Sequence, residues 1–125
     1  MHYKKDELTL LYNSKLARDI KTLAYANTIT SKINRQDVNS VEVSATLFKV
    51  MVDKLGGDPK VMINKSVPYY QKNLRGQEYP PKNWLQAIKK MPELLIAPVA
   101  LYKDRAVICN SPTDILKVLN APVSK

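Results

Sequence analysis

The sequence predicts an α/β protein with a mixed β-sheet, flanking helices and a helical block inserted between the two halves of the sheet. Three observations lead to this fold class. The chain begins with a short apolar run, a segment with helical spacing and a second short run. It ends with two short runs separated by Lys103-Asp104 and followed by another helical segment. Between these halves the apolar spacing is helical and prolines interrupt it.

The N-terminal half is predicted to form a strand, a helix and a second strand. Residues 8–12 are an apolar run with one β-branched residue, which is typical of a buried strand. Ser14 is placed to cap a helix over 15–28. Residues recur along that helix at helical spacing and are expected to face the core: Leu16, Ile20, Leu23, Ala24 and either Ala26 or Asn27. Residues 33–38 alternate weakly between apolar and polar, which favours an edge strand.

The middle of the chain predicts several helices. Ser44 is a candidate N-cap for a helix that ends at Gly56-Gly57, and its broad apolar face comprises Leu47, Phe48, Met51, Val52 and Leu55. Asp58-Pro59 begins a short helix over 60–64. Breaks at 67–68 and 76–81 separate further helical pieces. Pro80-Pro81 begins a helix that Pro92 ends or restarts, with core residues Trp84, Leu85 and Ile88.

The C-terminal half is predicted to form a β-hairpin and a helix. The strands are 98–102 and 105–109, joined by a two-residue turn. Ser111 caps the last helix and Pro112 occupies its first position, with a buried stripe of Ile115, Leu116 and Leu119. A strand–helix–strand half followed by a hairpin and a helix is a thioredoxin-type arrangement, here in one domain spanning residues 1–125 without an internal repeat.

Composition excludes several classes of function. With 45% hydrophobic and 25% charged residues in 125, wholesale disorder is excluded. One cysteine and one histidine leave no disulfide framework, no His/Cys metal cluster and no Ser-His or Cys-His catalysis, so we expect no metal and no cofactor. No apolar run reaches the roughly 20 residues of a membrane span, and the N-terminus does not resemble a signal peptide. We expect a cytoplasmic protein.

Three stretches in this order resemble one family: LTLLYNSKL at 8–16, MPELLIAPV at 91–99 and VICNSPTDI at 107–115. They are similar to the glutaredoxin-like arsenate reductase family, which includes the Spx-type transcriptional regulators. The resemblance covers nearly the whole chain, residues 8–119, and implies a thioredoxin-like fold with a catalytic cysteine at the start of the first helix. It also implies arginines that bind the substrate oxyanion.

The family's catalytic positions are degenerate in this chain. Asn13 matches the family motif, but the nucleophilic cysteine falls on Leu16, which has no thiolate. The arginine before the family's cis-proline falls on Ala97, and alanine cannot replace a guanidinium. A third arginine falls on Ile63 or Asn64, and a fourth on Asn110 or Ser111. Pro98 persists, and the resemblance implies a cis peptide before it.

The chain's excess positive charge is concentrated in one segment. Between residues 60 and 90, seven basic residues face only one acidic residue, Glu78, which leaves +6 of the chain's +9. The basic residues are Lys60, Lys65, Lys72, Arg75, Lys82, Lys89 and Lys90, and the interleaved aromatics are Tyr69, Tyr70, Tyr79 and Trp84. This pattern is compatible with single-stranded nucleic acid. It is equally compatible with solvated lysines and aromatics that anchor the helical block, which is the interpretation we favour.

Our leading hypothesis is a non-catalytic arsenate reductase/Spx-like protein that acts as a binding or regulatory module, with a protein partner, acidic in character, and no membrane. One alternative is a thiol-dependent oxidoreductase using a non-standard site such as Cys109. We expect this cysteine to be inert, because free cysteine is usually buried and no basic residue lies closer in sequence than Arg105. The other alternative is nucleic-acid binding through the basic 60–90 block.

Overall fold

A four-stranded mixed sheet forms the centre of the molecule. The computed structural model describes residues 7–40 and 42–119 and orders the strands β2-β1-β3-β4. β1 (Leu8–Tyr12) pairs in parallel with β2 (Ile33–Asp37) and antiparallel with β3 (Val99–Tyr102), and β3 pairs antiparallel with β4 (Arg105–Ile108). The predicted mixed sheet is confirmed, since each predicted strand forms with ends within one residue of those expected.

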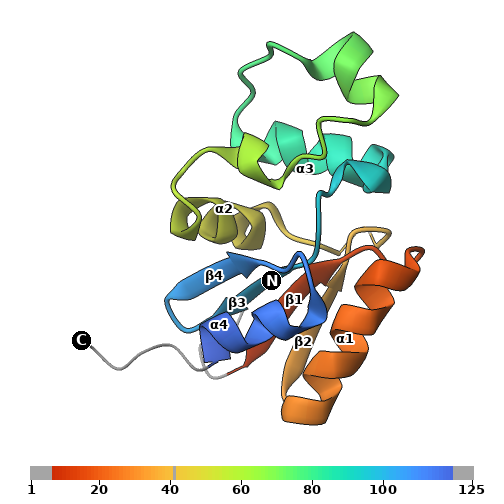
Figure 1. The fold of residues 1–125 in the computed structure, drawn as a ribbon. Helices are drawn as coiled ribbons and strands as arrows, with labels where there is room; N and C mark the ends of the chain where they lie inside the picture. Colours follow the sequence, from red (N-terminus) through yellow and green to blue (C-terminus); the bar gives the residue numbers. More distant parts are fainter. Residues whose placement is uncertain (1–6, 41, 120–125) are drawn as a thin grey trace.

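Helices cover both faces of this sheet (Figure 1). α1 (Ala17–Ile29) and α4 (Leu116–Leu119) lie on one face, while α2 (Ala45–Lys54) lies on the other with α3 (Pro81–Lys90) packed against α2 on the side away from the sheet. Successive strand residues point to opposite faces, so Leu10 packs with the α1 and α4 side while Leu11 packs with the α2 and α3 side. The result is a three-layered molecule with a hydrophobic core on each side of the sheet.

α2 forms as the sequence predicts. The Leu47 N–H donates to Ser44 Oγ at 3.0 Å, which confirms Ser44 as the N-cap. Four of the five predicted core residues of this helix are buried: Leu47, Phe48, Met51 and Val52. Burying a side chain of this size stabilises the fold by about 1.5–3 kcal/mol, so α2 contributes substantially to the core between the sheet and the helical block.

Apart from α3, the rest of the helical block between α2 and β3 consists of short helical turns. They are η1 (Pro59–Met62) and η3 (Pro92–Leu94), both 3₁₀ turns, and η2 (Tyr70–Leu74), a π-helical turn. The predicted helix over 60–64 is therefore shorter and tighter than expected. Asp58 caps η1 by accepting a hydrogen bond from the Lys60 N–H at 2.9 Å, and Ile63 is already extended.

α1 differs from its prediction in two ways. Its N-cap is Leu16, not Ser14, because hydrogen bonds to the loop hold residues 13–15 in a turn and delay the helix. Its buried residues are Asp19, Thr22 and Ala26, and Leu23 is partly buried against the core. The predicted apolar face is therefore right for Ala26 and Leu23 and wrong for Ile20 and Ala24, which are exposed. Ile20 is 42% exposed, because the helix turns a buried carboxylate toward the protein in its place.

The C-terminal helix also begins differently. Residues Pro112–Ile115 form a 3₁₀ turn, η4, before α4 continues the chain. With about three residues per turn at this point, Ile115 and Val118 share the buried side, while Leu116 and Leu119 are only partly buried. Of the predicted stripe, Ile115 is confirmed, and Val118 takes the place expected of the two leucines.

Within the described ranges, no helix combines the length and apolar character that crossing a membrane requires.

Candidate functional site

The loop between β1 and α1 contains the position where the resemblance implies a catalytic cysteine. Leu16 occupies it as the N-cap of α1, with an extended backbone (φ −108°, ψ 127°). Its carbonyl accepts hydrogen bonds from the N–H groups of Asp19 and Ile20, both at 3.1 Å. A leucine side chain has no oxygen or sulfur, so this residue begins the helix through its backbone and offers no nucleophile.

The side chain of Asn13 organises this loop. Its Oδ1 accepts hydrogen bonds from the Lys15 N–H at 3.0 Å and from Asn39 Nδ2 at 2.9 Å. The next residue, Ser14, donates its N–H to Asp37 Oδ1 at 3.2 Å. The loop is therefore fixed by the ends of β1 and β2, which are adjacent in the sheet.

Asp37 places a negative charge beside the same loop. Partial desolvation would raise its pKa, but hydrogen bonds donated by Ser14 and Asn39 outweigh that effect and hold the pKa of Asp37 below its usual value. A carboxylate that stays ionised here disfavours an anionic ligand at the loop.

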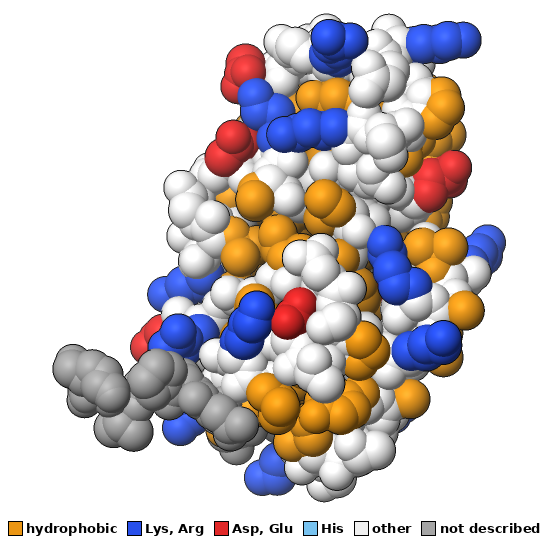
Figure 2. Space-filling model, viewed as in Figure 1, with side chains coloured by type: hydrophobic (Ala, Val, Ile, Leu, Met, Phe, Trp, Pro, Cys, Tyr) orange, Lys and Arg blue, Asp and Glu red, His pale blue; other side chains and the backbone are white. Residues whose placement is uncertain are grey.

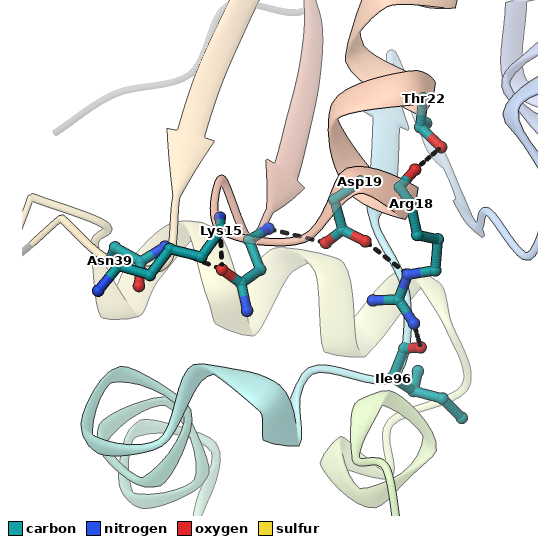
Figure 3. A network of polar contacts seen from close by, with 7 residues as sticks. Lys15, Arg18, Asp19, Thr22, Asn39 and Ile96 are labelled. Carbon is teal, nitrogen blue, oxygen red and sulfur yellow. Dashed lines mark hydrogen bonds and ion pairs between the residues drawn. The ribbon is translucent and has the colours of Figure 1, made fainter.

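Asp19 is the most unusual residue of the site. Its side chain is 0% exposed, yet it is acidic. Asp19 Oδ2 accepts the Asn13 N–H at 2.8 Å, and Oδ1 accepts Arg18 Nε at 2.6 Å. Figure 3 shows the same guanidinium reaching Ile96, whose carbonyl accepts Arg18 Nη1 at 2.8 Å. One arginine thus links the start of α1 to the segment just before Pro98.

This network pairs the arginine that could otherwise help to bind an oxyanion. A helix N-terminus and an arginine together favour negative charge. In this chain the carboxylate of Asp19 lies in the first turn of α1 and is paired with Arg18. An incoming arsenate or phosphate would meet an anion that is already in place.

Three of the degenerate family positions come close together in the fold. Ile63 forms a bridge with Leu95, and the Ile96 N–H donates to the Met62 carbonyl at 2.9 Å, which places the segment around Ile63 beside the one that leads to Ala97. Arg18 links that same segment to the helix that Leu16 begins. Ile63 and Ala97 are both buried and apolar, so neither supplies charge to the site.

The peptide bond before Pro98 is trans, as are all the peptide bonds among the described residues. The expectation of a cis bond is therefore wrong. The trans form is the intrinsically favoured one for most X-Pro bonds, and the Pro98 carbonyl accepts the Cys109 N–H at 2.7 Å in this geometry.

The fourth degenerate position lies at the start of η4. The N–H groups of Asn110 and Ser111 both donate to Asp114 Oδ2, at 2.9 and 3.1 Å. Desolvation alone would raise the pKa of Asp114. These hydrogen bonds and the neighbouring Lys117 outweigh that effect and hold the pKa below its usual value. Here too, a carboxylate of the chain occupies donors at a position where the family resemblance implies an arginine.

Cys109 lies just after β4 and is 1% exposed. Desolvation by burial, with the charge of Asp114 adding to it, raises the pKa of its thiol to about 12. The thiolate is the reactive form of cysteine, so at neutral pH this side chain behaves as a small apolar group.

The aromatic residues of the basic 60–90 block are largely part of the core. Trp84 is 0% exposed and packs against Tyr70 and Tyr79, with ring centroids at 6.5 and 5.3 Å. Two of the rings, Tyr70 and Trp84, are therefore unavailable for stacking on bases. On the face in Figure 2, Asp and Glu side chains lie among the Lys and Arg side chains.

The basic residues of the block play different roles. Lys60 pairs with Glu78 at 2.6 Å, and its side chain is mostly covered. Arg75 Nη1 donates a hydrogen bond to Gln71 Oε1 at 3.1 Å. Lys72 and Lys82 are exposed on separate segments, η2 and α3. Across the described part of the chain, no group of three or more His, Cys, Asp or Glu side chains is placed to hold a metal ion.

Comparison with solved structures gives clear matches to arsenate reductases. A Yersinia pestis protein assigned as an arsenate reductase superposes with a TM-score of 0.73 at 20% identity, covering 90% of this chain and 100% of that one. An arsenate reductase from Vibrio cholerae superposes with a TM-score of 0.72 at 17% identity, covering 92% and 99%. The chain has the arsenate reductase-like, thioredoxin-type fold. At this identity the likeness establishes the fold alone.

No family model matches the sequence, and no curated protein matches it either. The predicted fold class is thus confirmed by structure rather than by sequence similarity. The residues that sequence reasoning missed at the site are Arg18 and Asp19. The sequence signal that could have found them is a pair of adjacent opposite charges at the start of the predicted helix, but their contacts with Asn13 and Ile96 form only in the folded chain.

Proposed function

We propose that this chain is a non-catalytic protein of arsenate reductase-like fold that acts as a binding or regulatory module, in the cytoplasm. The observation that carries the proposal is the state of the α1 N-terminus. Leu16 stands at the cysteine position, and Asp19 with Arg18 satisfies the anion-binding features around it. These features support a chain that keeps the arsenate reductase-like fold without the nucleophile and the oxyanion-binding arginine that the family resemblance implies.

A protein partner is the favoured ligand for the same face. Ile20 is 42% exposed on α1, and Ala17 and Ala24 are exposed on the same helix. Between residues 14 and 29 the exposed charged side chains are all basic: Lys15, Arg18 and Lys21. An apolar strip with a basic margin complements an acidic protein surface.

Affinity capture from native cell extract, at low and at moderate salt, tests this proposal. We expect the wild-type chain to retain a specific acidic protein that is released as salt rises, because screening weakens exposed charge pairs. Ile20→Glu should lose that protein. Val61→Glu is the matched control, since Val61 is 39% exposed on a different segment, η1. Equal retention by all three chains contradicts the proposal.

Two alternatives are less well supported. A reductase using Cys109 needs an accessible thiolate, whereas this thiol is buried with a pKa of about 12. A Cys109→Ser variant that loses a measurable reductase activity would favour it.

Nucleic-acid binding through the 60–90 block predicts an affinity for DNA or RNA that falls steeply with salt. Binding that is absent or insensitive to salt excludes it.

A further inference from the structure

A hollow on the surface lies where α2 and α3 both begin. It has a volume of about 310 Å³, and its lining is Ala45, Thr46, Lys49, Pro80, Pro81 and Lys82. On the face in Figure 2, hydrophobic side chains gather over the region where Figure 1 places α2 beside α3. This hollow is separate from the α1 face described above, since it shares no residue with it.

The walls of the hollow are rigid and mostly apolar. Pro80 is the extended N-cap of α3 (φ −65°, ψ 160°), and Pro81 is its first residue. Proline rings have little freedom, and Ala45 has only a methyl group. One turn further along α3, Trp84 packs on Tyr79 and is fully buried, which fixes the start of this helix. The hollow is therefore preformed, which reduces the entropy that a ligand must overcome on binding.

The hollow is electrostatically positive at its margin. Lys49 and Lys82 line it, and no acidic residue is among the described residues that do. Lys49 is partly compensated by Asp53 at 3.1 Å, which leaves Lys82 as the main side-chain charge. Neither α2 nor α3 has an acidic residue in its first turn, so the positive ends of both helix dipoles add to this charge.

We propose that this hollow docks an extended acidic segment of another protein, which inserts one large apolar side chain between the prolines and Ala45 and places a carboxylate near Lys82. This inference rests on the proposed binding function and adds a second contact surface to it. At about 310 Å³ the hollow is at the small end of ligand pockets, which suits one side chain rather than a cofactor.

Charge argues against one other occupant, and the lack of an exposed aromatic ring argues against a second. A second copy of this chain carries +9 itself, so self-association would bring like charges together. Single-stranded nucleic acid needs exposed aromatic rings for stacking, and the tryptophan next to the hollow is buried. An acidic, partly apolar protein segment satisfies both the shape and the charge.

Amide proton–nitrogen NMR of the full chain tests the proposal with synthetic peptides. The probe is a short peptide with one Phe flanked by Asp and Glu, and the matched peptides replace the Phe by Ala or the acids by their amides. We expect saturable shifts at the amides of Ala45, Thr46 and Lys82 with the first peptide, and weaker shifts with the other two.

Matched variants then test the charge. Lys82→Glu should weaken the affinity by about fivefold, the effect of one favourable exposed charge pair, while Lys72→Glu should change it by less than about twofold. Both lysines are exposed, so both variants should fold. Ala45→Trp should abolish the shifts at the hollow by filling it.

Three results would overturn the inference: no saturable shift at these amides, equal affinity of all three peptides, or an unchanged affinity in Lys82→Glu. Shifts confined to α1 would also overturn it while leaving the proposed binding function intact. Arsenate turnover by the wild-type chain would instead contradict the proposed function, whatever happens at the hollow.

Discussion

At the scale of single residues, the candidate site centres on the ion pair between the buried Asp19 and Arg18. Asp19 is buried without water access, and it is tolerated because Arg18 and the Asn13 N–H satisfy both of its oxygens. A buried carboxylate is costly unless it is paired and hydrogen-bonded. The pairing therefore gives Arg18 a structural role that competes with ligand binding.

Removing Arg18 should test that role. Arg18→Ala leaves Asp19 buried without its charge partner and breaks the contact with the Ile96 carbonyl. Because the arginine side chain is 42% exposed and partly screened, we expect a loss of about 1–3 kcal/mol in the free energy of unfolding, measured by urea denaturation. Lys21→Ala, an exposed neighbour on the same helix, should cost less than about 0.5 kcal/mol. Equal effects of the two substitutions would contradict the account.

Cys109 gives a second prediction at this scale. Burial raises the pKa of its thiol from 9.0 to about 12, so we expect no alkylation by iodoacetamide at neutral pH in the native state and rapid alkylation after unfolding. When folding raises the pKa of a group, its contribution to stability is fully present at pH values below the pKa of the unfolded state. That contribution is lost as the pH rises toward the pKa of the folded state. The unfolding free energy should therefore fall between about pH 9 and pH 12 more in the wild type than in Cys109→Ala. Fast native labelling would contradict this prediction.

At the scale of elements, the two helices that follow strands of the N-terminal half begin by different means. α2 begins at Ser44, whose side chain caps the Leu47 N–H. α1 begins at Leu16, whose side chain makes no such bond, and Asp19 accepts the Asn13 N–H instead. The start of α1 is thus stabilised from inside the protein rather than by a local cap.

Removing the cap of α2 should have a measurable cost. Ser44→Ala leaves the Leu47 N–H without its acceptor, and we expect the unfolding free energy to fall by about 1 kcal/mol. Ser31→Ala, an exposed serine outside the helices, should change it by less than about 0.5 kcal/mol. Chemical denaturation of both variants checks this, and an unchanged stability in Ser44→Ala would rule out the cap.

The loop that joins the ends of β1 and β2 gives a pH dependence. Hydrogen bonds from Ser14 and Asn39 hold the pKa of Asp37 below 3.8 despite desolvation. When folding lowers the pKa of a carboxyl group, the group stabilises the fold at pH values above the pKa of the unfolded state. This stabilisation is lost as the pH falls through the pKa of the folded state. Stability should thus fall below about pH 4 more in the wild type than in Asp37→Asn, while Glu42→Gln, at an exposed site, keeps the wild-type profile. Parallel acid-denaturation curves for wild type and Asp37→Asn would contradict this.

At the scale of the whole molecule, the fold follows from the sequence more completely than the site does. The strands, the face of α2 and the thioredoxin-type order depend on apolar periodicity and on turn residues, which are local signals. The burial of Asp19 depends on the Asn13 N–H and on Arg18, and Arg18 reaches the distant Ile96 carbonyl only in the folded chain. The same reason explains why Ile20 lies outside and why the last helix buries Val118 in place of its leucines.

The central claim of our proposal is a separation of scaffold from chemistry. The chain superposes on an arsenate reductase structure over 90% of its length, carries Leu16 where the family resemblance implies a cysteine, and pairs Asp19 with Arg18 beside it. The retained surface and the excess of lysine suit contact with an acidic partner better than they suit holding one small anion.

The most direct test of this account is an arsenate reduction assay of the purified wild-type chain with glutathione and glutaredoxin. Because Leu16 offers no thiolate and Cys109 is buried, we expect turnover indistinguishable from the background without protein. Arsenate reduction above that background, by a preparation whose activity is lost in Cys109→Ser or in Arg18→Ala, would contradict it.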